Sequence, residues 1–219
     1  MLTAAQRDKR QSVIDACRSM NALGLNQGTS GNISVRDGDG FLVTPTSMPY
    51  DAMRPEDLVA MRFDHTVVGE GRPSTEWRFH LDILRDRPDV EAVVHAHPIY
   101  CTTLAILGRG IPPLHYMVCA AGGDSIRCAP YATFGTQALS DNALAALEGR
   151  KACLLAHHGM IAVGGSLASA MWLAVEVETL ARQYFNCLQL GAEPPLLSSE
   201  EVANVASRIA DYGLYSAPR

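Results

Sequence analysis

The sequence lacks the features that mark nucleic-acid-binding and membrane proteins. Its 18 Lys and Arg residues are outnumbered by 23 Asp and Glu residues, giving a net charge of −5, whereas a nucleic-acid-binding surface is basic. It also lacks a run of about 18 apolar residues, the length that a membrane-spanning helix needs. We therefore expect neither nucleic acid nor a membrane as a partner.

The cysteines do not form a recognisable pairing pattern. All six are scattered, without a C-x-x-C motif, which is typical of reduced thiols that pack as small apolar side chains. The first residues, MLTAAQRDKRQ, lack the apolar segment of a signal peptide. These observations predict a cytoplasmic protein.

What is present is an ordinary globular composition, with 47% apolar and 19% charged residues. The length suits one domain, residues 1–219. Apolar spacing predicts helices over 4–24, 73–87, 97–108, 138–149 (capped by Ser140 or Asp141), 166–190 and 198–213. Strands are expected over 33–36, 41–44, 59–63, 65–69 and 89–97, then in ACLLAHHG and MIAVG around a turn, with strand and loop over 112–135. This order predicts an α/β sandwich, in which helices cover a central, mostly antiparallel sheet.

Two histidines at the end of the apolar run VEAVVHAH are the first candidate metal ligands. His95 and His97 are two residues apart, so on a strand they project from the same face and can close on one ion. Glu76, in PSTEW, and His158, in LAHHGM, are the further candidates. Three imidazoles and one carboxylate form a tetrahedral set that suits zinc.

The composition of this set favours a catalytic over a structural metal. Structural zinc is usually enclosed by cysteines, whereas catalytic zinc keeps an exchangeable position, which Glu76 could provide. A glutamate in the first turn of a helix can also simply complement the helix dipole. His157 points away from His158 if the chain is extended there, so we do not expect both to be ligands; His157 would then either contact a ligand or be merely structural.

Three polar loops are candidates for binding phosphate without basic side chains. They are the glycine-rich stretch 28–32, the stretch 44–47 after a strand, and Ser74-Thr75 at a helix start, where free N–H groups favour an anion. Ser74 and Thr75 lie directly beside Glu76. A phosphate held there would place the rest of its molecule near the metal.

Several of these motifs, in order, resemble the class II aldolase/adducin family. The resemblance rests on GTSGNISVR, FLVTPTSMPY, RPSTEWRFH, VVHAHPIYCTTLA and LLAHHGM, and it extends over nearly the whole chain to DYGL. It implies zinc held by Glu76, His95, His97 and His158, one ion per subunit. It implies a substrate phosphate site made of Gly31, Asn32, Thr46, Ser47, Ser74 and Thr75.

The resemblance also implies catalytic roles and an assembly. Glu76 would be the acid/base, Tyr116 a proton donor to the aldehyde, and Tyr212 a second tyrosine on a tail that reaches a neighbouring subunit. The assembly implied is a homotetramer with sites between subunits. Where Ser47 and His157 stand, the family often has Gly and Asn.

The reaction that the resemblance implies is reversible aldol cleavage. A ketose 1-phosphate (L-fuculose 1-phosphate or a related 5-deoxypentulose 1-phosphate) would split into dihydroxyacetone phosphate and a small aldehyde. Zinc would stabilise the carbanion as an enediolate, and Glu76, displaced from the metal, would move the proton. No Schiff-base lysine is then needed, in keeping with only two lysines, Lys9 and Lys151, both outside the motifs.

Two alternatives stay open at this point. One is another reaction on the same fold, namely a sugar-phosphate epimerase or a methylthioribulose-1-phosphate dehydratase; the epimerases carry a shorter acidic residue where Glu76 stands. The other is a non-catalytic adducin-like module, which would have no use for three histidines and Glu76. Product identification and metal analysis distinguish them.

Overall fold

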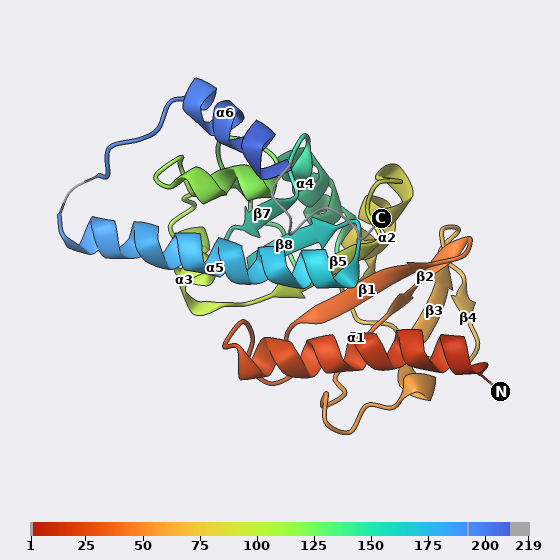
Figure 1. Ribbon diagram of the computed structural model, residues 1–219. Coiled ribbons are helices and arrows are strands. Elements are labelled where there is room, and N and C mark those ends of the chain that lie inside the picture. Colours follow the sequence, from red (N-terminus) through yellow and green to blue (C-terminus); the bar gives the residue numbers. More distant parts are fainter. Residues whose placement is uncertain (1, 192, 211–219) are drawn as a thin grey trace.

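The computed structural model describes residues 2–191 and 193–210, shown in Figure 1. In this part of the chain, eight strands form one sheet in the order β4-β3-β2-β1-β5-β8-β7-β6. Neighbouring strands are antiparallel except β6 and β7, which are parallel. The strands are β1 Asn32–Asp37, β2 Gly40–Val43, β3 Val59–Arg62, β4 Val67–Val68, β5 Ala92–Ala96, β6 Arg127–Ala129, β7 Ala152–Leu155 and β8 Gly159–Gly164.

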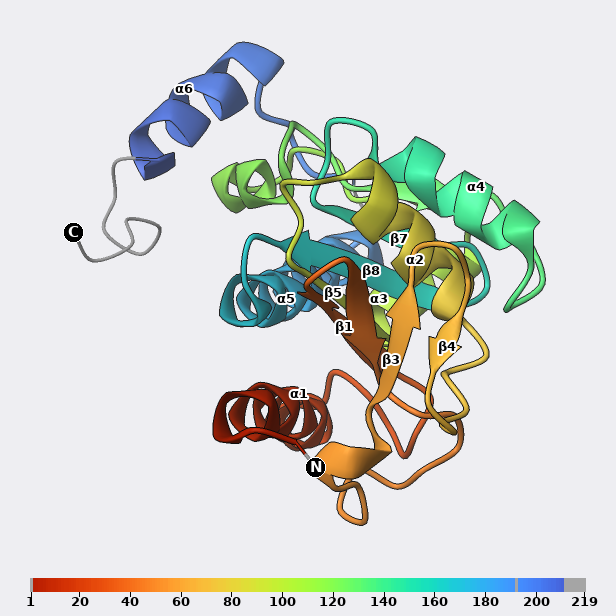
Figure 2. The same ribbon diagram turned by 90° about the vertical axis from the view of Figure 1, so that its right-hand side faces the viewer.

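Helices cover both faces of this sheet, which confirms the predicted sandwich (Figure 2). One face packs against α1, α3 and α5, and the other against α2 and α4. The helices are α1 Ala4–Ala22, α2 Trp77–Asp86, α3 Ile99–Ile106, α4 Gln137–Leu147, α5 Leu167–Gln189 and α6 Ser199–Ala210, with 3-10 turns η1 Pro55–Asp57 and η2 Tyr116–Ala121. Among the described residues, no helix is both long and apolar enough to cross a membrane.

The alternation of side chains along β5 decides which face carries the polar site. Val94 packs into the core on the α1/α5 side, whereas Val93 packs into the core on the α2/α4 side. His95 is on the same face as Val93, since successive side chains of a strand alternate, and its ring contacts that of Phe79 on α2 with centroids 5.3 Å apart. The buried His95 therefore faces α2, the helix that follows Glu76.

Two helix starts differ from the sequence prediction. The helix expected from Pro73 begins only at Trp77, because Ser74 N donates to Thr44 O at 2.9 Å and Pro73 forms an isolated β-bridge with Pro45. The predicted caps of the helix over 138–149 were wrong: Thr136 caps α4 by accepting from the N–H of Leu139.

A third difference lies in the segment expected to be strand and loop, residues 112–135. It also contains the 3-10 helix η2, while its strand, β6, spans only three residues. The short helical turn has no apolar spacing long enough for the sequence pattern to reveal it.

Candidate metal centre and substrate cleft

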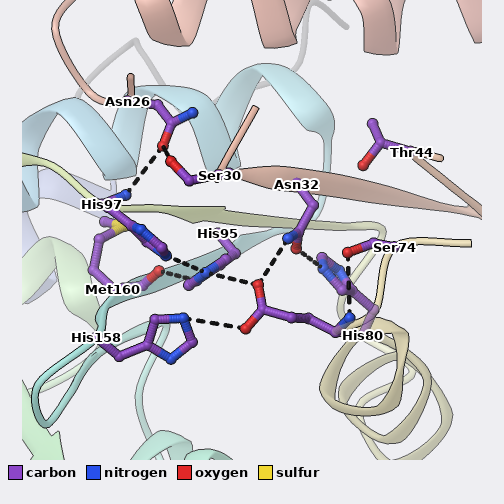
Figure 3. A network of polar contacts seen from close by, with 12 residues as sticks. Asn26, Ser30, Asn32, Thr44, Ser74, His80, His95, His97, His158 and Met160 are labelled. Carbon is purple, nitrogen blue, oxygen red and sulfur yellow. Dashed lines mark hydrogen bonds and ion pairs between the residues drawn. The ribbon is translucent and has the colours of Figure 1, made fainter. Parts of the chain in front are cut away.

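The end of β5 presents two imidazoles on one side of the sheet. His95 Nε2 and His97 Nε2 are 3.0 Å apart. The other ring nitrogen of His95, Nδ1, lies 2.9 Å from the carbonyl oxygen of Met160 on β8 (Figure 3). Since a carbonyl only accepts, Nδ1 carries the proton, and the lone pair of Nε2 is left free to face His97 and Glu76.

Glu76 and His158 meet this pair from other parts of the fold. Glu76 Oε2 is 3.1 Å from His95 Nε2, and Glu76 Oε1 is 3.1 Å from His158 Nε2. Glu76 occupies the position just before α2, and His158 lies in the turn between β7 and β8. One ligand atom from each of the four residues, called the metal centre below, lies within 4.8 Å of the others: Glu76, His95, His97 and His158.

The donor atoms of the metal centre fit a bound cation. Glu76 Oε1 is buried and has no hydrogen-bond partner among the described residues, although His158 Nε2 is 3.1 Å away. Such an oxygen would be costly without a partner. A cation between the carboxylate and the imidazoles would satisfy it, and three nitrogen donors with one oxygen match a catalytic zinc set.

The ionisation of these groups also favours a cation over protons. Burial alone would raise the pKa of Glu76, but the adjacent His95 and His158 outweigh it and lower the pKa. Burial, together with the neighbouring imidazoles, lowers the pKa of His97 to about 3. An ionised carboxylate and a neutral imidazole are the forms that metals bind.

The position of Glu76 corrects one sequence interpretation. It is not in the first turn of α2 but at the N-cap, and its side chain does not cap the backbone. Its carboxylate instead accepts from Asn32 Nδ2 at 2.9 Å and contacts the histidines. Dipole complementation therefore does not account for this glutamate.

A cleft of about 360 Å³ opens beside the metal centre. All six residues predicted to bind substrate line it: Gly31, Asn32, Thr46, Ser47, Ser74 and Thr75. They come from the loop before β1 and its first residue, Asn32, from the loop after β2, and from the stretch before α2. A side chain at Gly31 would place its Cβ 2.8 Å from the carbonyl oxygen of His95, so a glycine is needed where the loop passes the metal centre.

Of the two predicted tyrosines, the structure describes only Tyr116. Tyr116, at the start of η2, is 48% exposed and stacks on His115 with ring centroids 4.5 Å apart. It is not among the residues that line the cleft of its own chain. Tyr212 lies outside the described residues.

Sequence reasoning missed one wall of the cleft. Tyr131 and Phe134, both exposed, line it together with Ala132 and His157. The rings of Tyr131 and His157 meet edge to face at 5.9 Å. His157 has a left-handed backbone, with φ of 55°, so its side chain reaches the cleft rather than pointing away as on an extended chain. The signal that could have indicated this wall is the pair of aromatic residues in PYATFG, a stretch that does not continue a helix or strand pattern.

Comparisons with known proteins agree with this geometry. Residues 11–185 match the family described as Class II Aldolase and Adducin N-terminal domain. A 5-methylthioribulose-1-phosphate/5-deoxyribulose-1-phosphate aldolase of Rhodospirillum rubrum is 56% identical over 204 residues, covering 93% of this chain and 92% of the relative. An L-fuculose phosphate aldolase of Escherichia coli strain K12 is 50% identical, covering 93% and 95%.

The fold is shared with a solved structure. An L-fuculose 1-phosphate aldolase superposes with a TM-score of 0.90 at 37% sequence identity, covering 95% of this chain and 98% of the other. The likeness therefore extends over nearly the whole fold.

Proposed function

The chain belongs to the class II aldolase and adducin family, and from this premise we propose a zinc-dependent mechanism and assign roles to the residues of the cleft. The chain is a class II, metal-dependent aldolase that cleaves a ketose 1-phosphate, and its histidine and glutamate cluster is a divalent-metal site. The observation that carries the proposal is the convergence of four ligand atoms within 4.8 Å beside a hydroxyl-lined cleft.

Zinc is the metal that we propose for this site. Three imidazole nitrogens with one carboxylate oxygen suit it, whereas magnesium and calcium prefer oxygen ligands alone. When bound, the metal supplies a Lewis acid that stabilises negative charge on substrate oxygens. His95, His97 and His158 would hold it, with Glu76 as the exchangeable ligand.

Glu76 is proposed as the acid/base that moves the proton at the reacting carbon. Its oxygen Oε1 is free of hydrogen bonds among the described residues, while Oε2 is held by Asn32. The residue also lines the cleft. A general acid or base must reach the substrate and be in the correct ionisation state, and the lowered pKa of Glu76 keeps it a carboxylate in the absence of substrate.

The phosphate of the substrate is proposed to bind where the three hydroxyl-rich loops meet. Ser74 and Thr75 precede α2, so the phosphate would face the N-terminal end of that helix, where N–H groups and the dipole favour an anion. Thr46 and Ser47, whose hydroxyl oxygens are 3.3 Å apart, add further donors from the loop after β2. The phosphate would then need no lysine or arginine.

The aldehyde half of the substrate is proposed to lie against the aromatic wall. Relatives are named for 5-methylthioribulose 1-phosphate, 5-deoxyribulose 1-phosphate and L-fuculose phosphate. We propose that this chain acts on the same group of compounds. Tyr131 and Phe134 offer an apolar surface that suits an aldehyde ending in a methyl or methylthio group.

A homotetramer with sites shared between subunits is proposed for the assembly. The exposed ring of Tyr116 lies away from the cleft of its own chain, so it could serve a site only from a neighbouring subunit. Tyr212 is proposed for the same role from the tail.

The proposal is tested by product analysis with a Glu76→Gln variant. Wild-type protein loaded with zinc should release dihydroxyacetone phosphate from at least one of the three ketose 1-phosphates. The variant should keep its zinc and lose activity by about 10²- to 10⁴-fold, the usual contribution of a general acid or base. Release of an epimer or of water instead would show another reaction, and full activity in the variant would refute the role of Glu76.

A further inference from the structure

A chain of buried hydrogen bonds leads away from the metal centre through a histidine that is not a ligand. Asn32 Nδ2 donates to Glu76 Oε2 at 2.9 Å, and Asn32 Oδ1 lies 2.5 Å from His80 Nε2. The other ring nitrogen of His80, Nδ1, is 2.7 Å from the hydroxyl of Ser34. All four residues are buried, and Figure 3 shows the His80 ring beside Asn32.

Two short sequence spacings produce this chain. Asn32 and Ser34 are two residues apart on β1, so they face the same side of the sheet. Glu76, at the N-cap, and His80, within α2, are four residues apart, so their side chains lie on the same side of the start of the helix. The strand pair faces the helix pair, and the contacts cross between them three times.

Which group donates in each of these hydrogen bonds follows from the carboxylate of Glu76 at one end of the series. The ionised carboxylate of Glu76 only accepts, so the NH₂ group of Asn32 must face it. The amide oxygen of Asn32 then faces His80, whose Nε2 must donate. A neutral imidazole that donates from Nε2 accepts at Nδ1, so the hydroxyl of Ser34 donates there.

Complete burial keeps the His80 ring neutral. Its exposed fraction is 0%, and burial together with the nearby His95 lowers its pKa to about 3. One tautomer of one uncharged ring thus fixes which way the amide of Asn32 points.

We propose that His80 is a positioning residue for the aldolase reaction: it fixes the amide of Asn32 so that this amide holds Glu76 by Oε2 and leaves Oε1 free. The inference rests on the proposed acid/base role of Glu76. If the amide turned over, its oxygen would face the carboxylate, and both would be acceptors. Glu76 would then be repelled from the position in which Oε1 lies beside His158.

Two amide substitutions at His80 distinguish the contact that Nε2 makes with Asn32 from the contact that Nδ1 makes with Ser34. The amide of His80→Gln extends to about the place of Nε2, so it can still donate to Asn32. The amide of His80→Asn reaches only to about the place of Nδ1, so it can pair with Ser34 but not with Asn32. We expect kcat to fall about 10- to 100-fold in His80→Asn, as for residues that orient metal ligands, with KM and zinc content unchanged, and to recover at least in part in His80→Gln.

A matched control removes a buried hydrogen bond elsewhere on the same helix. Ser140 Oγ donates to the buried Asp82 of α2 at 2.6 Å, and among the described residues no hydrogen bond joins this pair to Glu76. Ser140→Ala should lower stability without changing kcat. If His80→Asn behaves like Ser140→Ala, or if His80→Gln is as impaired as His80→Asn, His80 is only structural and the proposal is overturned.

A direct measurement of the tautomer needs no activity. In metal-free protein labelled with ¹⁵N-histidine, the signals absent from His80→Gln identify His80. We expect the neutral form with its proton on Nε2 between pH 6 and 8; a proton on Nδ1, or a charged ring, would overturn the proposal. The proposed function fails separately, if wild type releases no dihydroxyacetone phosphate or Glu76→Gln stays active.

Discussion

Gly159, the first residue of β8, should control how well the metal centre binds its ion. A Cβ at this position would lie 2.5 Å from the carbonyl oxygen of Ala96 and 2.7 Å from Cδ2 of the His97 ring. Comfortable carbon–oxygen contacts start at about 3.3 Å, so Gly159→Ala forces a displacement of nearly an ångström. The neighbours that must move are the end of β5 and a proposed ligand.

The expected cost follows from that overlap. Overpacking a well-packed site costs about 1–3 kcal/mol. If the His97 ring moves to relieve the overlap, zinc binding must move it back, and the free energy of binding is weakened by the same cost of about 1–3 kcal/mol. Because about 1.4 kcal/mol corresponds to tenfold, the affinity for zinc should fall about 5- to 150-fold. Competition with a chromophoric chelator measures the affinity, and urea unfolding of metal-free protein measures the stability.

Gly165→Ala is the matched control. Its nearest neighbour to an added Cβ is the carbonyl oxygen of Asp89, at an ordinary 3.8 Å, so the change in stability should stay within about 0.5 kcal/mol. Equal zinc affinity in Gly159→Ala and Gly165→Ala would refute the reasoning. A loss of stability without a loss of affinity would show that the backbone of Ala96, not His97, takes up the strain.

Two further predictions concern histidines near the cleft. The pKa of His80 is about 3 in the folded protein and near 6.5 in an unfolded chain. Between these values only the unfolded chain binds a proton at this residue. Lowering the pH from 7.5 to 5 should therefore reduce the free energy of unfolding by about 2 kcal/mol through His80. Urea unfolding should show a drop smaller by that amount in His80→Gln; equal drops would contradict the prediction. His157→Asn should raise the free energy of unfolding by up to about 1 kcal/mol, because a left-handed backbone costs about 1–2 kcal/mol and the short amide of asparagine can offset part of this cost by hydrogen-bonding locally. Thermal unfolding of the two proteins measures this, and an unchanged or lower Tm would count against it.

The sequence predicted the His95 and His97 half of the metal centre from local spacing, whereas Glu76 and His158 come from distant segments and were added by residue type and by the family resemblance. His95 and His97 share a strand face by their two-residue separation, and the turn holding His158 was expected between two short strands. The sandwich followed in the same way from apolar periodicity. What a local pattern determines, the sequence predicts.

What depends on distant contacts was missed or misplaced. The start of α2 is shifted to Trp77 by backbone contacts between the stretch before it and the loop after β2. The loop that carries Phe134 is joined to α2 by a long-range hydrogen bond, in which Arg78 Nε donates to the carbonyl oxygen of Gly135 at 3.0 Å. The orientation of Asn32 depends on His80, 48 residues away in sequence. The partners of such contacts are too far apart in sequence for a local pattern of residues to include both.

The strand order has a consequence for the order of events during synthesis. Among the strands of the described residues, β8 is the last to be made, yet it lies between β5 and β7 in the interior of the sheet. A nascent chain that ends before Met160 cannot yet pair that residue with Ala96 or fix the ring of His95 through the Met160 carbonyl. Domains generally fold as units as the chain emerges from the ribosome. Acquisition of the metal is therefore a late event, and a tightly held ion marks a chain whose sheet is complete.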